Sequence, residues 1–247
     1  MTIETKKPID IPTRETSEFI ASNIPAQSTI LEIGCGEGHV GAELTDRGIE
    51  VTGIDPDSEA VENAAALGGK VIRGSWPDVT VGDFNAIAFT RSLHHIEDLT
   101  GAVEKAADVL REQGIFLLED FAFNVTDQRT LDWFLKLLKS EPISSLVKPE
   151  PDEFAARLLL AGDPMDEWKR DQHHDLHSAE EMRSAIKHRF EVIAEYSVPY
   201  FYRYLVPVFP KTSEAAESVD EMLLEENRLG ASNEIVLVGR RIVAVKK

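Results

Sequence analysis

The chain has 247 residues, which is long enough to bury the core of one α/β domain that carries an insertion. Its formal net charge is −18 and no run of Lys and Arg could follow a phosphate backbone, so a nucleic-acid partner is disfavoured. The single cysteine excludes an intrachain disulfide, and no apolar run has the length of a membrane span or the placement of a signal peptide. We therefore expect a cytoplasmic protein, monomeric or homodimeric, with one domain over residues 1–247 and no membrane partner.

The first half of the chain alternates helix-like and strand-like segments, which is typical of βαβ units in a parallel sheet. The expected strands are residues 29–33, 49–54, 71–73, 85–89 and 114–119, and the expected helices are residues 13–23, 40–46, 58–67 and 99–110, the third capped by Ser58. Five strands at this spacing predict an α/β fold, Rossmann-like and doubly wound, with a mostly parallel sheet and helices on both faces.

The regular alternation ends after Asp120. Residues 124–177 are interpreted as helical pieces separated by proline-containing turns, one piece spanning 154–160, and they predict a helical insertion that acts as a lid. The box Ser178-Ala179-Glu180-Glu181 predicts a helix to Lys187. A strand over 190–198, a helix over 213–227 and a strand or strand pair over 235–245 complete a sheet of seven strands.

A glycine-rich turn follows the first expected strand at residues 31–38, Leu-Glu-Ile-Gly-Cys-Gly-Glu-Gly. Glycines at alternate positions let the backbone turn tightly and approach a ligand, because no Cβ stands in the way. The overlapping residues 36–41 match the dinucleotide pattern GxGxxG, so the turn predicts a bound ligand but leaves phosphates, dinucleotides and nucleosides open.

Asp55 ends the second strand about twenty residues after the glycine turn, a spacing typical of a carboxylate that accepts hydrogen bonds from ribose hydroxyls. In an open parallel sheet the ligand lies beyond the carboxyl ends of the strands, where Gly34, Asp55, Ser75 and Thr90 should meet. The alternative is that Asp55 caps the following helix.

Three blocks in this order resemble the class I S-adenosylmethionine-dependent methyltransferases of small-molecule type. They are residues 31–38, Val-Thr-Gly-Ile-Asp at 51–55, and Ser-Leu-His-His-Ile-Glu-Asp at 92–98. The resemblance covers residues 28–120 well and the last two strands loosely.

The resemblance implies a cofactor, S-adenosyl-L-methionine, which becomes S-adenosyl-L-homocysteine. Gly34, Cys35 and Gly36 would lie under its methionine and ribose parts, Asp55 would hold the ribose and Pro56 would contact adenine. The other cofactor residues implied are Glu32 beneath the turn, Gly38 within it, and Thr90 at the end of the fourth strand. For Glu32 the alternative is a strand-end carboxylate bonded to nearby backbone.

The chain departs from the family pattern after the third strand, where many members carry an acidic residue for the adenine amino group. Here Gly74-Ser75-Trp76 follows, so Ser75 would offer one neutral hydrogen bond and Trp76 could stack on the base. Ordinary packing of Trp76 is the alternative.

His94 and His95 are the candidates for a general base, because a neutral imidazole can accept a proton from a hydroxyl or amine near working pH. The alternative is that the two histidines only lie at the start of a helix and contribute to packing.

A second histidine group, His173-His174-Asp175-Leu176-His177, lies ahead of the capping box. Because His177 precedes a helix and no cysteine is near, we expect no metal there, and His174 and His177 become candidates for substrate contact together with His95. Tyr200 and Tyr202 are candidates for the walls of an acceptor pocket, with core packing as the alternative.

The sequence thus predicts a methyltransferase that moves a methyl group to a small-molecule acceptor by in-line displacement. Two alternatives remain: a module that binds S-adenosylmethionine without chemistry, and, with less support, a nicotinamide-dependent oxidoreductase. The acceptor atom and the acceptor itself are left open.

Overall fold

The computed structural model describes residues 6–147, 153–171 and 177–247, and its chain forms two compact units. One unit consists of residues 13–121, 177–196 and 240–247, and we call it the sheet unit. The other consists of residues 1–12, 122–176 and 197–239, and we call it the helical unit.

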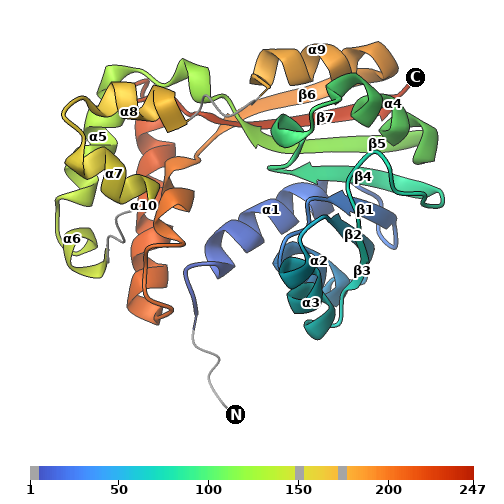
Figure 1. Ribbon diagram of the computed structural model, residues 1–247, viewed down its shortest axis with the longest axis horizontal. Coiled ribbons are helices and arrows are strands. Elements are labelled where there is room, and N and C mark those ends of the chain that lie inside the picture. The colour runs from blue at the N-terminus through green and yellow to red at the C-terminus, as the bar shows by residue number, and fades with distance from the viewer. Residues whose placement is uncertain (1–5, 148–152, 172–176) are drawn as a thin grey trace. The chain divides into compact units, whose positions relative to one another are not determined.

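A sheet of seven strands follows the order β3-β2-β1-β4-β5-β7-β6 (Figure 1). The strands are β1 (Thr29–Ile33), β2 (Glu50–Asp55), β3 (Lys70–Arg73), β4 (Phe84–Thr90), β5 (Leu110–Phe121), β6 (Phe190–Val198) and β7 (Gly239–Lys246). Parallel pairs join β1 with β2, β1 with β4, β2 with β3 and β4 with β5, and the sheet has one antiparallel hairpin. The strand order reverses between β1 and β4, where a ligand crevice is expected, so the doubly wound fold is confirmed.

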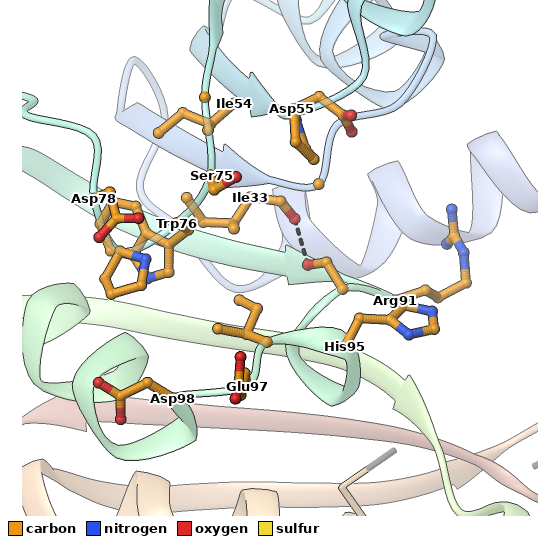
Figure 2. Close-up of a pocket in the computed structure, with 16 residues that line it drawn as sticks. Ile33, Ile54, Asp55, Ser75, Trp76, Asp78, Arg91, His95, Glu97 and Asp98 are labelled. Atoms are coloured by element: carbon orange, nitrogen blue, oxygen red, sulfur yellow. Dashed lines mark hydrogen bonds between the residues drawn. The ribbon is translucent and has the colours of Figure 1, made fainter. Parts of the chain in front are cut away.

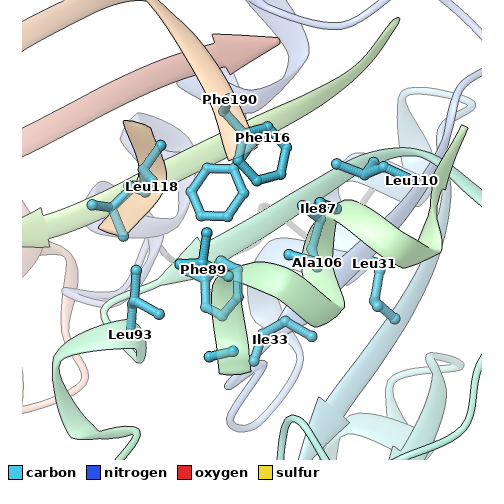
Figure 3. Packing of buried hydrophobic residues seen from close by; sticks show 14 of the residues in the cluster. Leu31, Ile33, Ile87, Phe89, Leu93, Ala106, Leu110, Phe116, Leu118 and Phe190 are labelled. Atoms are coloured by element: carbon cyan, nitrogen blue, oxygen red, sulfur yellow. The ribbon is translucent and has the colours of Figure 1, made fainter. Parts of the chain in front are cut away.

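Side-chain alternation along the central strands divides the hydrophobic core of the sheet unit between two faces. On one face Leu31, Phe89 and Phe116 pack with α4 (Leu99–Val109) and α9 (Ala179–Arg189), as Figure 3 shows for the strand residues and α4. On the other face the neighbouring strand positions pack with α1 (Asp10–Ser22) and α2 (His39–Asp46). Burial on both faces explains why these strands are almost continuously apolar.

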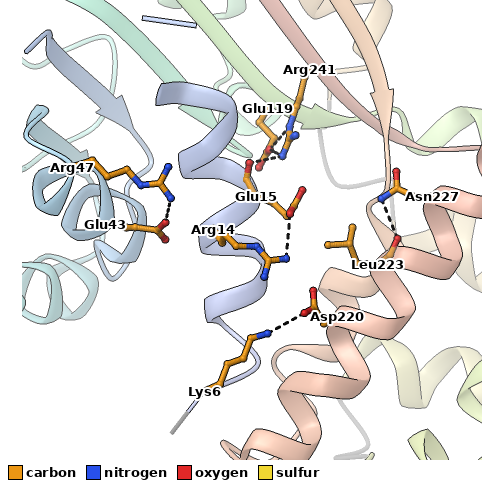
Figure 4. Close-up of polar contacts among 10 residues, drawn as sticks. All are labelled: Lys6, Arg14, Glu15, Glu43, Arg47, Glu119, Asp220, Leu223, Asn227 and Arg241. Carbon is orange, nitrogen blue, oxygen red and sulfur yellow. Dashed lines mark hydrogen bonds and ion pairs between the residues drawn. The ribbon is translucent and has the colours of Figure 1, made fainter. Parts of the chain in front are cut away.

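Buried Glu119 on β5 ties three segments of the sheet unit together. Its carboxylate accepts hydrogen bonds from Thr16 Oγ1 at 2.6 Å, from Arg241 Nε at 2.7 Å and from Arg91 Nη1 at 3.0 Å. The Arg241 contact is visible in Figure 4. A buried carboxylate is costly without partners, so this set of donors lets Glu119 remain inside the unit.

The helix caps show one correction to the sequence analysis. The cap of α3 (Ser58–Ala66) is Asp57, whose Oδ1 accepts a hydrogen bond from Ala60 N at 2.8 Å, and not Ser58, which is the first helical residue. The capping box ahead of α9 is confirmed, since Ser178 and Glu181 each bond the backbone nitrogen of the other.

The helical unit contains several helices between residues 124 and 177, where helical pieces separated by turns were expected. These are α5 (Gln128–Leu138), α6 (Ile143–Leu146), α7 (Phe154–Leu160) and α8 (Pro164–Asp171), to which α10 (Ser213–Ala231) and the short turn η3 (Phe201–Leu205) are added. Trp168 stacks on Phe201 with ring centroids 5.2 Å apart, and Phe134 packs against the same ring at 4.9 Å. These aromatic contacts form the core of the unit.

None of the helices in the described residues is both long and apolar enough to cross a membrane.

Candidate functional site

A cavity of about 760 Å³ opens at the carboxyl ends of β1, β2, β3 and β4, within the sheet unit (Figure 2). Among the residues expected at the site, those that line it are Gly34, Asp55, Pro56, Ser75, Trp76 and His95. Its size lies in the range of small-molecule and cofactor pockets.

Gly34 provides the tight turn between β1 and the cavity. Its φ is +73°, and its N–H donates to Ile54 O at 2.8 Å. A Cβ at this position would come within 2.4 Å of the Cβ of Ser92, whose hydroxyl donates to Ile33 O at 2.5 Å. Both the backbone angle and the close approach of Ser92 therefore require glycine here.

Asp55 lines the cavity at the end of β2, and its carboxylate organises the backbone around it. Oδ2 accepts a hydrogen bond from Gly36 N at 2.9 Å, and Oδ1 accepts one from Asp57 N at 2.9 Å. Each oxygen retains a second acceptor site, so the carboxylate can still accept two donors from a ligand. A Cβ at Gly36 would meet no atom within 4 Å, so the backbone of the turn faces open space at that point.

Glu32 and Thr90 lie beneath the turn and do not line the cavity. Thr90 Oγ1 donates to Glu32 Oε1 at 3.0 Å, and both residues are buried. Glu32 Oε2 has no hydrogen-bond partner in the part of the chain that the structure describes. Burial raises the pKa of Glu32 to about 7, although the Thr90 hydrogen bond and the charge of Arg91 act in the opposite direction.

Cys35 and Gly38 belong to the glycine turn, but neither of them lines the cavity. Burial, together with the charges of Glu32 and Asp55, raises the pKa of the Cys35 thiol to about 12, so its sulfur is a poor nucleophile at neutral pH. Gly38 precedes α2 with φ +80°, and a Cβ there would lie 2.7 Å from the Cβ of Ala64. Its role in the structure is close packing of α2 against α3.

The loop after β3 supplies an acidic residue that the sequence analysis missed. Trp76 is buried, and its indole N–H donates to Ala102 O at 3.0 Å, so its ring is fixed by packing while one part of it lines the cavity. Asp78 lines the same end of the cavity, beyond Pro77. The available signal was its position three residues after Ser75, in the same loop.

Four further polar residues line the cavity: Arg91, Ser92, Glu97 and Asp98. Arg91 has the left-handed φ of +61°, and its N–H donates to Glu119 O at 2.7 Å. Arg91 carries the one guanidinium among the described residues that line the cavity. Glu119 accepts hydrogen bonds from Arg91 twice, with its backbone oxygen from the backbone N–H and with its carboxylate from Nη1.

His94 and His95 are neighbours in sequence but occupy different environments in the turn η1 (Leu93–His95). His95 lines the cavity and is exposed, whereas His94 is buried, with Nδ1 2.6 Å from Oδ1 of the fully buried Asp120. The two imidazole rings lie 3.9 Å apart between centroids. Partial burial of its ring, followed by the charge of His94, lowers the pKa of His95, although Asp120 acts in the opposite direction, and the lowered pKa favours the neutral form.

Of the remaining substrate candidates, His177, Tyr200 and Tyr202 are not among the residues that line this cavity. His177 is in the sheet unit, where its Nε2 lies 2.9 Å from Ile96 O and its backbone N–H donates to His94 O. Tyr200 and Tyr202 are buried in the helical unit, where their backbone N–H groups donate to Glu226. His173 and His174 lie outside the described residues.

Within the described residues, no group of three or more His, Cys, Asp and Glu side chains could hold a metal ion.

Comparison with known proteins identifies the same architecture. The sequence model of a protein family described as "Methyltransferase domain" matches residues 11–193. Two curated relatives are an uncharacterised methyltransferase, YcgJ of Bacillus subtilis, and a ubiquinone biosynthesis O-methyltransferase of Alkalilimnicola ehrlichii. The first is 30% identical over 107 residues, which is 38% of this chain and 41% of YcgJ; the second is 22% identical over 185 residues, which is 71% of this chain and 72% of the relative.

Solved structures agree at the level of the fold. The crystal structure of YcgJ superposes with a TM-score of 0.53 and 18% identity, covering 94% of this chain and 99% of YcgJ. The plantazolicin methyltransferase BamL, solved in complex with a desmethyl substrate analogue and SAH, superposes with a TM-score of 0.53 and 18% identity, covering 97% of this chain and 84% of BamL.

Proposed function

Because this chain belongs to the S-adenosylmethionine-dependent methyltransferases, we propose that it transfers the methyl group of S-adenosylmethionine to a small-molecule acceptor in the cavity of the sheet unit. The observation that carries the proposal is the carboxylate of Asp55 beside the turn of Gly34 at the point where the strand order reverses.

The residues around the cavity fit the cofactor. Asp55 has two acceptor sites left for the ribose hydroxyls, and the open backbone at Gly36 leaves room for the ligand. Pro56 and Trp76 offer apolar surface for adenine, and Asp78 offers an acceptor for its amino group. Asp78 thus takes the part that the sequence analysis had left to Ser75. When bound, the cofactor supplies a methyl group that its sulfonium has already activated.

The protein's own part in the reaction is binding, orientation and proton transfer. A ring nitrogen of His95 would accept the proton that the acceptor's hydroxyl or amine releases when the acceptor takes the methyl group supplied by the bound cofactor. His94 faces Asp120 in the core, so it takes no direct part. Fixing the acceptor in line with methyl and sulfur supplies the main acceleration, which can amount to several kcal/mol.

A small acceptor agrees with the charge of the molecule and of the cavity. Four carboxylate residues line the cavity, namely Asp55, Asp78, Glu97 and Asp98, and the chain carries a net charge of −18. Such a field opposes a polyanionic nucleic acid.

We further propose that residues 124–177 act as the lid that selects the acceptor. Replacing residues 124–177 by a short linker should abolish turnover and spare cofactor binding, and full turnover without these residues would exclude this role.

The function is tested by titrating the protein with S-adenosylhomocysteine in a calorimeter and by following the formation of S-adenosylhomocysteine from S-adenosylmethionine with a panel of phenols, amines and carboxylic acids. Binding together with turnover of at least one acceptor supports the proposal. Binding without turnover of any acceptor supports the non-catalytic module, and preferential binding of NAD would favour the oxidoreductase.

A further inference from the structure

The buried contact between His94 and Asp120 has no part in the reaction described above. Asp120, the residue before the end of β5, has no exposed surface, and His94 in η1 is 4% exposed. The Nδ1 of His94 lies 2.6 Å from Oδ1 of Asp120, and the backbone N–H of His94 points to Oδ2 at 3.4 Å. A carboxylate and an imidazole are expensive to bury, so two such groups facing one another beside a cavity require an explanation.

The contact continues to the cavity through a second ring. The imidazoles of His94 and His95 lie 3.9 Å apart between centroids with an angle of 46° between their planes, and His95 is the one that lines the cavity. Phe121 also packs against His94, with ring centroids 5.1 Å apart and the two rings nearly perpendicular. Asp120, His94 and His95 therefore form a continuous series from the core to the cavity.

The backbone around His94 is also held in place. Its carbonyl accepts a hydrogen bond from His177 N at 3.1 Å, and the ring of His177 bonds Ile96 O at 2.9 Å. The turn that carries both His94 and His95 is thus fixed from the side of α9 as well as from β5. The ring of His94 can change its orientation only if it leaves Asp120.

We propose, on the basis of the function above, that Asp120 and His94 are positioning residues that hold His95 in the cavity so that it accepts the proton of the acceptor. Asp120 holds the ring of His94 at ion-pair distance, and that ring packs against the imidazole of His95. The same arrangement of a carboxylate behind an imidazole orients catalytic bases in unrelated enzymes.

The charges around His95 agree with this arrangement. Burial and the neighbouring His94 lower the pKa of His95, whereas Asp120 raises it. The other titratable groups of this region are Arg91, Glu97 and Asp98 at the same cavity, Glu119 behind Arg91, and His177 ahead of α9. The two positioning residues thus act on His95 in opposite directions, which gives the experiment a signature that mere packing would not produce.

The test follows the ring signals of His95 by NMR during a pH titration of the full-length protein without ligand. His94→Asn retains a side-chain N–H for Asp120 but removes the second imidazole, and Asp120→Asn removes the negative charge with little change in shape. The matched control is His188→Asn, because His188 is exposed on α9. We expect the midpoint of His95 to rise by about half a pH unit or more in His94→Asn and to fall in Asp120→Asn.

The proposal is overturned if neither variant moves the midpoint of His95 further than His188→Asn does. If His94→Asn fails to fold, Asp120→Asn alone decides. This readout requires no acceptor, whereas the proposed function is tested by cofactor titration, so the two can fail separately. With an acceptor in hand, Asp120→Asn should lower kcat about tenfold or more and leave the KM for S-adenosylmethionine unchanged.

Discussion

Asp55 holds two backbone N–H groups before any ligand binds. One comes from the glycine turn after β1 and the other from the start of the helix after β2, so a single carboxylate fixes two of the loops that border the cavity. The alternative expectation, that Asp55 caps the following helix, is wrong, and its contact with a ligand stays a prediction. The cap of α3 itself is Asp57.

Replacing Asp55 with Asn should weaken binding of S-adenosylhomocysteine about 10- to 100-fold, because charge-assisted hydrogen bonds to ribose are lost and the amide would turn an N–H toward a backbone donor. Calorimetric titration measures the dissociation constant. Asp57→Asn is the matched control, since asparagine caps a helix as well as aspartate does. Equal affinity of Asp55→Asn and the wild type would contradict the role of Asp55.

A comparison of Gly34 with Gly48 distinguishes the energetic cost of a positive φ from the cost of a steric collision. Both have positive φ, +73° and +80°, but a Cβ at Gly48 would meet no atom within 4 Å, whereas one at Gly34 would collide with Ser92. Gly48→Ala should cost about 1 kcal/mol of unfolding free energy from strain alone. Gly34→Ala should cost clearly more and also reduce binding of S-adenosylhomocysteine, as urea unfolding and calorimetry would show; equal costs for the two variants would exclude the collision as a factor.

Three of the cavity residues that the sequence predicted, Gly34, Asp55 and Ser75, follow from the strand ends, because the strand boundaries and the parallel topology together place them at one edge of the sheet. The different environments of His94 and His95 could not be read from the sequence. They depend on a single turn of 3-10 helix, in which adjacent side chains diverge, and on Asp120 at the end of another strand.

At the scale of elements, the sequence predicted segments whose boundaries have a local physical cause. The bounds of β1 and α7 are as expected, as are those of β6, which follows α9 directly. The helix α8 (Pro164–Asp171) was not expected. Trp168 is the one buried side chain among the described residues of this helix, so the segment lacks the periodic apolar pattern that predicts a helix. Its start depends on Asp163, which accepts hydrogen bonds from Met165 N and Asp166 N.

The capping box of α9 gives a prediction at this scale. Ser178→Ala removes the acceptor for Glu181 N and one of two donors to the Glu181 carboxylate, so it should lower the unfolding free energy by about 1 kcal/mol. Thr100→Ala, at an exposed position inside α4, should cause no loss, because alanine favours helix. Urea unfolding of both variants checks the difference, and a loss of equal size in Thr100→Ala would contradict the cap.

At the scale of the whole molecule, the described residues of each unit include a buried carboxylate whose pKa is raised to about 7 by burial. In the sheet unit it is Glu32, with one hydrogen bond from Thr90. In the helical unit it is Glu226, which accepts hydrogen bonds from the backbone of Tyr200, Phe201 and Tyr202. Both groups bind a proton more tightly in the folded state than in the unfolded chain, where the ordinary value is 4.5.

Stability should therefore fall as the pH rises from about 4.5 to about 7, since over this range the folded state retains protons that the unfolded chain has released. Each group contributes roughly 1 kcal/mol of stability per pH unit, and the contribution is fully present below the unfolded pKa.

Glu32→Gln keeps an oxygen for Thr90 and removes the ionisation, so the variant should gain stability relative to the wild type as the pH rises from 5 to 8. Glu104→Gln, an exposed position on α4, makes the same change in charge and corrects for the general repulsion among the acidic residues. Urea unfolding at pH 5, 6, 7 and 8 measures the difference between the two variants; if it stays constant across this range, Glu32 does not carry a raised pKa and is ionised in the fold.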